Sequence, residues 1–414
     1  MAARLGANAG EAVVHWRKVT ELLAGERDVP EARALLGQAR ARLVYAAGRS
    51  AAPEEEVATL FAEARRELGD ADSRDLALTL ASYAIVRNAA GNVEEAHRLA
   101  AEALEMARRL DDPELLAAML GCANIIYPAV EFPGEHARMV AEIERLCGTD
   151  PALGEDLIGF RVWTLASGNG IGALVRFGRG GEVEGLLAQM RSRVGGSHNS
   201  IEQVVLHAQC ATVRAMRGDV SDALEHGRQA LEWAMRSQNL AIRVIGHVAR
   251  GRGLLAVGRL DEALEQLERA MVLAIDRAMY KGFVVGAGVP FLAETQLRRG
   301  DLEAARSTAE RGIELARAMG YRHAEAVNLI ALSRALIAAG DTAGAAATLT
   351  RASELATALD ARDLPPRIEE ARAELARHDH DHVGCERALH AAARMHRENG
   401  EEWLATQAEA RIGR

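Results

Sequence analysis

The sequence has few aromatic residues and almost no lysine. Phenylalanine, tryptophan and tyrosine make up 4% of the 414 residues, and Lys18 and Lys281 are the only lysines. No Gly-x4-Gly-Lys-Ser/Thr phosphate-binding motif can be built around either lysine, and His-Glu-x-x-His, Gly-x-Ser-x-Gly and Cys-x-x-Cys are also missing. These absences argue against the common nucleotide-binding, metalloprotease, esterase and zinc-ribbon classes. We therefore expect a chain that is not an enzyme and needs no cofactor.

Cysteines, long apolar runs and basic blocks are also scarce. The four cysteines form no paired motif, and the N-terminus shows no secretory signal, which favours reduced thiols and a cytoplasmic location. No apolar run approaches the ~20 residues that span a bilayer. The net charge is −9 and no block of basic residues stands out, which argues against nucleic acid as a partner.

What the sequence has in abundance is helix-forming residues arranged in a repeat. Gly218, Gly258, Gly300 and Gly340 stand about 40 residues apart, each followed by a similar short block such as Gly300-Asp301-Leu302-Glu303-Ala304-Ala305, and Gly91 opens a fifth block upstream. A fixed period in this range is typical of stacked helical repeats. Small residues stand seven before each glycine and five and twelve after it, where two helices would cross closely; they are Ala84, Ala211, Gly251, Ala293 and Ser333, then Ala96, Ala223, Ala263, Ala305 and Ala345, then Ala103, Ala230, Ala270, Gly312 and Ala352.

The glycines suit the left-handed residue that ends a helix, and the Asp or Asn that follows most of them suits the cap of the next helix. This spacing resembles the tetratricopeptide repeat (TPR), with a period near 40 residues in place of the usual ~34. The expected fold is all-α, a right-handed α-solenoid of TPR-like helix-turn-helix repeats.

We expect residues 1–25 to hold an N-terminal capping helix (11–23) and residues 26–414 to form one continuous solenoid. The remaining helices are predicted over 30–47, 53–68, 73–90, 93–110, 113–130, 135–147, 155–177 and 182–194, in clear repeats from 200 to 359, and over 366–376, 383–397 and 401–412. Glycine is dense between residues 167 and 181, which predicts a weakened helix and a hinge or bend. Gly168-Asn169-Gly170-Ile171-Gly172 has the letters of a dinucleotide loop, but no βαβ unit surrounds it, which favours an irregular helix.

One cluster has the residue types of a metal site. His378, His380, His382 and Cys385 carry donors that suit Zn²⁺ or Ni²⁺. Asp381, however, lies 40 residues after Asp341, where a turn belongs. We therefore favour a polar turn capped by Asp381 and expect no metal.

The inner face of the solenoid is the better candidate for function. In the TPR pattern the first helix of each pair lines the concave side. The glycine register places five polar residues there, with Arg298 beside them; the five are Asn88, Asn124, Arg252, Glu294 and Arg334. Such side chains suit an extended peptide or a partner helix. The alternative is that these are ordinary solvated charges. Pro290 falls inside a predicted helix of this wall and is expected to kink it.

Several stretches suggest a wider relationship. Arg-Arg-Leu-Asp-Asp-Pro-Glu at 108–114, Ala-Arg-Ala-Met-Gly-Tyr at 316–321 and the run from 394 to 405 resemble the C-terminal TPR region of bacterial STAND-type signalling ATPases. Those proteins carry a nucleotide cyclase or LuxR-type DNA-binding domain, and no such segment is present here. The resemblance implies a non-catalytic scaffold or sensor that binds a protein or peptide in bacterial signal transduction. The alternatives are a separated regulatory region of a cyclase or LuxR-type regulator, and an enzyme with an unfamiliar site near 167–181.

Overall fold

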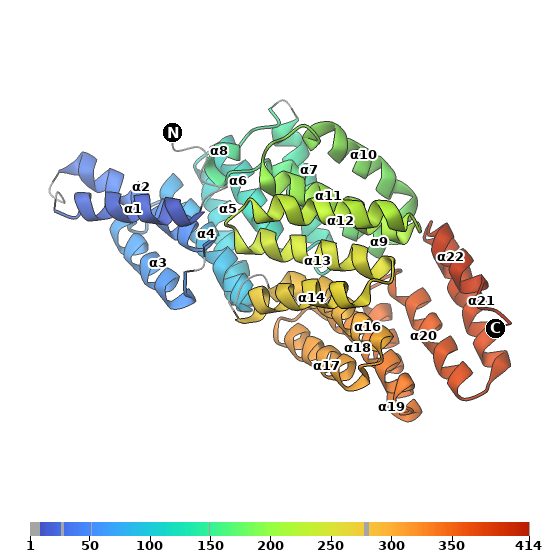
Figure 1. The fold of residues 1–414 in the computed structure, drawn as a ribbon. Coiled ribbons are helices and arrows are strands. Elements are labelled where there is room, and N and C mark those ends of the chain that lie inside the picture. The colour runs from blue at the N-terminus through green and yellow to red at the C-terminus, as the bar shows by residue number, and fades with distance from the viewer. Residues whose placement is uncertain (1–8, 26–28, 51, 149, 277–280, 414) are drawn as a thin grey trace.

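The computed structural model describes residues 9–25, 29–50, 52–148, 150–276 and 281–413, and this part of the chain contains helices and turns but no strand. The fold is therefore the expected all-α solenoid, wound from α1 at one end to α22 at the other (Figure 1). The α-helices are α1 (Ala9–Leu23), α2 (Pro30–Ala47), α3 (Glu54–Leu68), α4 (Arg74–Ala90), α5 (Val93–Arg109), α6 (Pro113–Ile126), α7 (Pro133–Cys147), α8 (Glu155–Ile158), α9 (Val162–Arg176), α10 (Val183–Val194), α11 (Ser200–Met216), α12 (Val220–Met235), α13 (Leu240–Ala256), α14 (Leu260–Met271), α15 (Lys281–Phe283), α16 (Val289–Arg299), α17 (Leu302–Ala318), α18 (Arg322–Ala338), α19 (Thr342–Ala358), α20 (Leu364–His378), α21 (His382–Glu398) and α22 (Glu402–Glu409). A 3-10 turn, η2 (Gly180–Glu182), and two π-helical segments, η3 (Val272–Asp276) and η4 (Val284–Gly288), complete the described elements.

The turns between paired helices are built as the repeat predicts. All five turn glycines have the left-handed backbone that a side chain disfavours, with φ of 96° at Gly91, 79° at Gly218, 76° at Gly258, 86° at Gly300 and 82° at Gly340. The capping prediction is mostly wrong. Asp219, Asp301 and Asp341 each stand at the N-cap, but among them only the Asp341 side chain accepts a hydrogen bond from its helix, from Gly344 N at 2.9 Å.

The small residues of the repeat lie at close helix crossings. All fifteen positions are buried, and the thirteen alanine and serine side chains among them are at most 3% exposed, as at Ala84, Ala263 and Ala345. A Cβ added at Gly251 would stand 2.6 Å from Leu267 Cγ, and one added at Gly312 would stand 2.3 Å from Asn328 Oδ1. Two helices therefore approach at these points more closely than a larger side chain allows.

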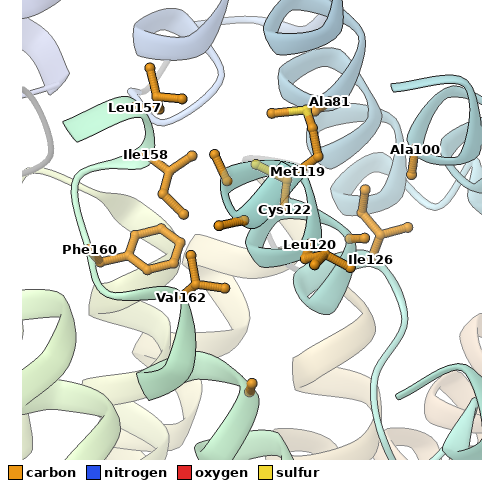
Figure 2. Packing of buried hydrophobic residues seen from close by; sticks show 14 of the residues in the cluster. Ala81, Ala100, Met119, Leu120, Cys122, Ile126, Leu157, Ile158, Phe160 and Val162 are labelled. Atoms are coloured by element: carbon orange, nitrogen blue, oxygen red, sulfur yellow. The ribbon is translucent and has the colours of Figure 1, made fainter. Parts of the chain in front are cut away.

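The glycine-rich region differs from the prediction in two places. The single helix expected over 155–177 is divided into α8 and α9 at Gly159, whose φ is 77°. Figure 2 shows Ile158 and Phe160 pointing from this link toward α6, where Phe160 is 1% exposed. The expected irregularity at 167–172 is wrong, because α9 runs unbroken through Gly168. Close packing explains why residue 168 is a glycine, since a Cβ there would lie 2.7 Å from Val205 Cγ1.

Pro290 lies inside a continuous helical stretch, because α15, the π-helical segment η4 and α16 follow one another without a break from residue 281 to residue 299. It is the second residue of α16 and lacks the N–H that would donate to the preceding turn. The disturbance predicted at this proline thus coincides with a change of helix type directly before it.

Segments from the first half of the solenoid contact segments from the second half through hydrogen bonds. Tyr321 donates its hydroxyl proton to Asn88 Oδ1 at 3.3 Å, although the two residues are 233 apart in sequence. Glu131, between α6 and α7, accepts hydrogen bonds from the backbone N–H groups of His323 and Ala324 at the start of α18, at 3.0 and 2.8 Å. Arg176 at the end of α9 donates to the carbonyl of Leu359 at 2.9 Å. These contacts hold the first and second halves of the winding together.

Candidate functional site

A row of polar side chains runs along the solenoid, one from the first helix of each successive repeat. Thr212, Arg252, Glu294 and Arg334 each lie six residues before a turn glycine, on α11, α13, α16 and α18. Arg252 Nη1 donates to Thr212 Oγ1 at 2.8 Å, and Arg334 Nη1 lies 3.7 Å from Glu294 Oε2. The structure therefore brings neighbouring members of this set together. We call these four residues and Glu374 the inner row.

The fifth member of the inner row was missed from sequence. Arg334 pairs with Glu374 at 3.5 Å and with Glu370 at 3.2 Å, both on α20, and Glu374 also pairs with Arg411 at 3.0 Å. The sequence feature that could have revealed Glu374 is His380. It lies 40 residues after Gly340, at the position of the next turn glycine, and has a left-handed φ of 60°. Counting six residues back from His380 reaches Glu374.

The two arginines of the inner row sit in opposite electrostatic surroundings. Burial alone lowers the pKa of Arg334, but Glu374, Glu294 and Glu370 outweigh it and raise that pKa. Burial and the nearby charge of Arg367 lower the pKa of Arg252 to about 10. Its guanidinium lies 4.3 Å from the centre of the Phe291 ring, and none of the described carboxylates forms an ion pair with it.

Most of the predicted residues are less exposed than the solvated-charge alternative assumes. The side chains of Glu294 and Arg334 are 23% and 22% exposed, whereas that of Arg298 is 51% exposed and pairs with Glu294 at 2.6 Å. Asn88 and Asn124 are buried and engaged within the chain. Asn124 Oδ1 accepts from Asn169 at 2.7 Å and has no exposed surface. The function proposed below does not use these two asparagines.

A buried charged histidine lies next to the inner row and was also missed from sequence. His396 is 2% exposed, with Nδ1 2.7 Å from Glu401 and Nε2 3.2 Å from Glu370. Burial opposes the charged imidazolium, but the hydrogen bonds and charges of the two carboxylates raise the pKa of His396 to about 9. Because Glu370 also pairs with Arg334, this cluster ties α18, α20 and α21 together.

The candidate metal donors are arranged as a turn. Asp381 accepts from Gly384 N at 2.8 Å, so the predicted cap is confirmed. His378 lies at the exposed end of α20 with Nδ1 3.4 Å from Asp379, while Cys385 is 7% exposed and packs inward. His380 occupies the turn position noted above and His382 begins α21. Across the described ranges, no three His, Cys, Asp or Glu side chains are grouped so as to hold a metal ion.

Within the part of the chain that the structure describes, no helix combines the length and the apolar character needed to cross a bilayer.

The search of curated proteins finds no match. Solved structures are also found among the proteins similar to this chain. A Rap protein complexed with Competence and Sporulation Factor is 14% identical, with a TM-score of 0.54 over 81% of this chain and 96% of that chain.

Aspartyl phosphate phosphatase F from Bacillus subtilis is 12% identical, with a TM-score of 0.40 over 83% of this chain and 94% of that chain. A signal transduction ATPase with numerous domains and a tetratricopeptide repeat sensor, from Pyrococcus horikoshii, is 11% identical, with a TM-score of 0.47 over 84% of this chain and 54% of that chain. The model of the MalT-like TPR region matches residues 197–412. Because this match covers more than half of the sequence, the chain belongs to the family of MalT-like TPR regions.

Proposed function

We propose that this chain is a non-catalytic module that binds a protein or peptide along the inner row, as a sensor or scaffold in bacterial signal transduction. The observation that carries the proposal is the row itself. Five successive first helices each place one polar or charged side chain at the same repeat position, from Thr212 on α11 to Glu374 on α20. An extended chain or a helix laid across the repeats meets one such group per repeat.

The order of charges along the inner row differs from one end to the other, so a partner with complementary charges would bind in one orientation. Its charges alternate along the repeats as Arg252, Glu294, Arg334 and Glu374. Glu294 and Arg334 are held in place by ion pairs, so their orientation is fixed before a partner arrives, which lowers the ordering cost of binding. The Rap protein of similar fold, which is complexed with Competence and Sporulation Factor, is consistent with a partner-binding role for such a solenoid.

We further propose that the module acts as the regulatory region of a larger signalling protein, with a cyclase or a LuxR-type regulator as the form to test. Membership of the MalT-like TPR family supports this reading. Sequencing the gene upstream and downstream of this stretch is the direct test. An uninterrupted reading frame into an ATPase, cyclase or DNA-binding segment supports it, and stop codons on both sides refute it.

The binding proposal is tested with a variant that alters the inner row without stranding charges. Arg252→Gln, Glu294→Gln and Arg298→Gln together leave Arg334 paired with its two carboxylates on α20. Partners are captured from an extract of the source cells by the wild-type chain and identified by cross-linking and mass spectrometry. We expect the affinity of a captured partner to fall by about tenfold or more, since each lost hydrogen bond contributes about 0.5–1.5 kcal/mol.

The matched control changes three outward-facing charges on second helices. Glu225→Gln, Glu265→Gln and Arg306→Gln lie on α12, α14 and α17 and are exposed. We expect this variant to retain the partner. Loss of the partner with the outer set and retention with the inner set would contradict the proposal and move the binding surface to the convex side. Helical content measured by circular dichroism confirms that both variants are folded.

A further inference from the structure

A small cavity lies where the first half of the winding meets the start of the second. Its volume is about 50 Å³, and it is partly enclosed by α4, α6, α9, α11 and α13 together with the C-terminal end of α2. Six aliphatic side chains give the cavity most of its wall; they are Ile85, Ile125, Leu165, Ile201, Ile242 and Ile245. Arg49 and Asn239 are the only two residues of the described lining that carry polar side chains.

Arg49 is a buried cation whose described contacts are one backbone carbonyl and two aromatic rings. It is 8% exposed, and its Nη1 donates to the carbonyl of Ile158 at 3.0 Å. Its guanidinium lies 4.2 Å from the ring centre of Tyr45 and 5.3 Å from that of Phe160. Among the described residues, no aspartate or glutamate forms an ion pair with Arg49. The described groups that stabilise the charge of Arg49 are therefore the faces of two aromatic rings and one backbone carbonyl.

This arrangement is unusual for a buried arginine. Charged side chains are almost never fully buried unless they are paired, because removing a charge from water is costly. Arg176 is a buried arginine in the same molecule with acidic groups around it, since it is 3% exposed and lies in the field of Glu131, Asp363 and Asp360. None of the described aspartates or glutamates forms an ion pair with Arg49, which instead lines a cavity. An anion entering the cavity would supply the missing charge.

We infer that this cavity is a binding site for an aliphatic carboxylate, with the carboxylate on the Arg49 guanidinium and a short branched tail among the isoleucines. The tail must be small, because 50 Å³ corresponds to about three to five water molecules by the volume that a water occupies on this measure. Two sources present this chemistry, namely a free branched carboxylic acid and the C-terminal leucine, isoleucine or valine of a peptide. The site is separate from the inner row, so this inference does not depend on the proposed function.

Calorimetric titration of the full chain with matched probes tests the inference. Isovalerate carries the carboxylate and the branched tail, isoamylamine keeps the tail with a positive head, and acetate keeps the head alone. We expect isovalerate to bind and the other two to bind at least about tenfold more weakly, in line with the strength of a hydrogen bond to a charged group. Binding of isoamylamine as tight as that of isovalerate, or no binding of isovalerate or of the peptides below, would overturn the inference.

Peptide probes distinguish the two sources. A tripeptide ending in leucine with a free carboxylate is compared with the same peptide carrying a C-terminal amide. Tighter binding of the free peptide than of isovalerate assigns the site to a peptide C-terminus, and the reverse order assigns it to a free acid. An amide that binds as well as the free peptide would contradict the role given to Arg49.

Two substitutions test the residues themselves. Arg49→Met removes the charge while keeping an unbranched apolar chain, and Ala241→Leu narrows the cavity without touching the charge. Both should weaken the binding of the tightest probe by about tenfold or more. Ala346→Leu, on the exposed side of α19, is the control and should bind as the wild type does. If Arg49→Met does not fold, Ala241→Leu still decides the result, since undiminished binding there refutes the site.

Discussion

Arg49 near the N-terminal end and Arg334 near the C-terminal end are both arginines withdrawn from solvent, and they differ in their counter-charges. Arg334 is shared by Glu294, Glu370 and Glu374, whereas Arg49 meets aromatic rings and a carbonyl. The charge of Arg334 is therefore balanced within the chain. At Arg49 none of the described aspartates or glutamates forms an ion pair, and this difference separates the surface proposed to bind a partner from the cavity proposed to take an anion.

The two halves also differ in how their cores are connected. One hydrophobic cluster runs without interruption from Val44 to Ile245. Beyond it, the buried residues fall into several smaller clusters, such as the one from Ile313 to Ala371. Repeats joined by small clusters interact mainly with their neighbours, so they can unfold in part. The first half is expected to unfold as one unit and the second half in steps.

The largest difference is expected from removing the two arginines. Arg334→Met leaves three carboxylates without their shared cation and should lower the free energy of unfolding by about 3 kcal/mol, at the low end for a buried ion pair because the site is partly exposed. Arg49→Met strands no carboxylate and should change stability by less than about 1 kcal/mol in the absence of ligand. Urea unfolding followed by circular dichroism measures both values. Equal losses would remove the distinction between the two halves.

His396 should make the C-terminal half sensitive to alkaline pH. Its pKa of about 9 in the folded chain lies above its ordinary value of 6.5, so the stabilisation is fully present below pH 6.5 and is lost as the pH rises through about 9. We expect a loss of about 3 kcal/mol across this window, since each pKa unit corresponds to about 1.4 kcal/mol. His396→Gln should flatten that part of the stability profile. A wild-type profile as flat as that of the variant would show that His396 is neutral in the folded chain.

Overpacking one crossing in each half tests the difference in core connectivity. Ala96 and Ala263 occupy the same repeat position and are both fully buried, the first in the large cluster and the second in a small one. Each change to leucine should cost about 1–3 kcal/mol. Hydrogen exchange should show that Ala96→Leu loosens the whole first half and that Ala263→Leu loosens mainly its neighbouring repeats. Equally wide effects would contradict stepwise unfolding.

The smallest effect concerns two aspartates that look alike in sequence. Asp341 caps its helix through Gly344 N, so Asp341→Ala should cost about 1 kcal/mol. Asp301 makes no such hydrogen bond and pairs with Arg299 at 3.6 Å on the surface, so Asp301→Ala should cost less than about 0.5 kcal/mol. Thermal unfolding of the two variants side by side is sufficient, and a reversed order would be inconsistent with the observed caps.

The parts of the fold that were predictable are those set by local sequence. The predicted helix over 30–47 coincides with α2, and the turn glycines reveal the repeat because a left-handed backbone is required at each of them. The break at Gly159 was not predictable in this way. It follows from Ile158 and Phe160 packing against α6, which no repeat period encodes.

In the candidate site, too, the residues that could be predicted are those whose position depends on local sequence. The glycine register placed Arg252, Glu294 and Arg334 at one repeat position, because that position depends only on counting along a helix. Arg49 and His396 escaped notice because their surroundings come from distant segments. The carbonyl beside Arg49 lies 109 residues away in sequence, and Glu370 lies 26 residues from His396. Sequence periodicity carries no information about such contacts.

The contact between Glu131 and the start of α18 has a consequence for the order in which the molecule is made. Its two sides are 192 residues apart, so a ribosome adding about 5–20 residues per second produces Glu131 roughly 10–40 s before His323. Throughout that interval the carboxylate faces water with its eventual partner not yet synthesised. Slow translation beyond Glu131 lengthens this interval.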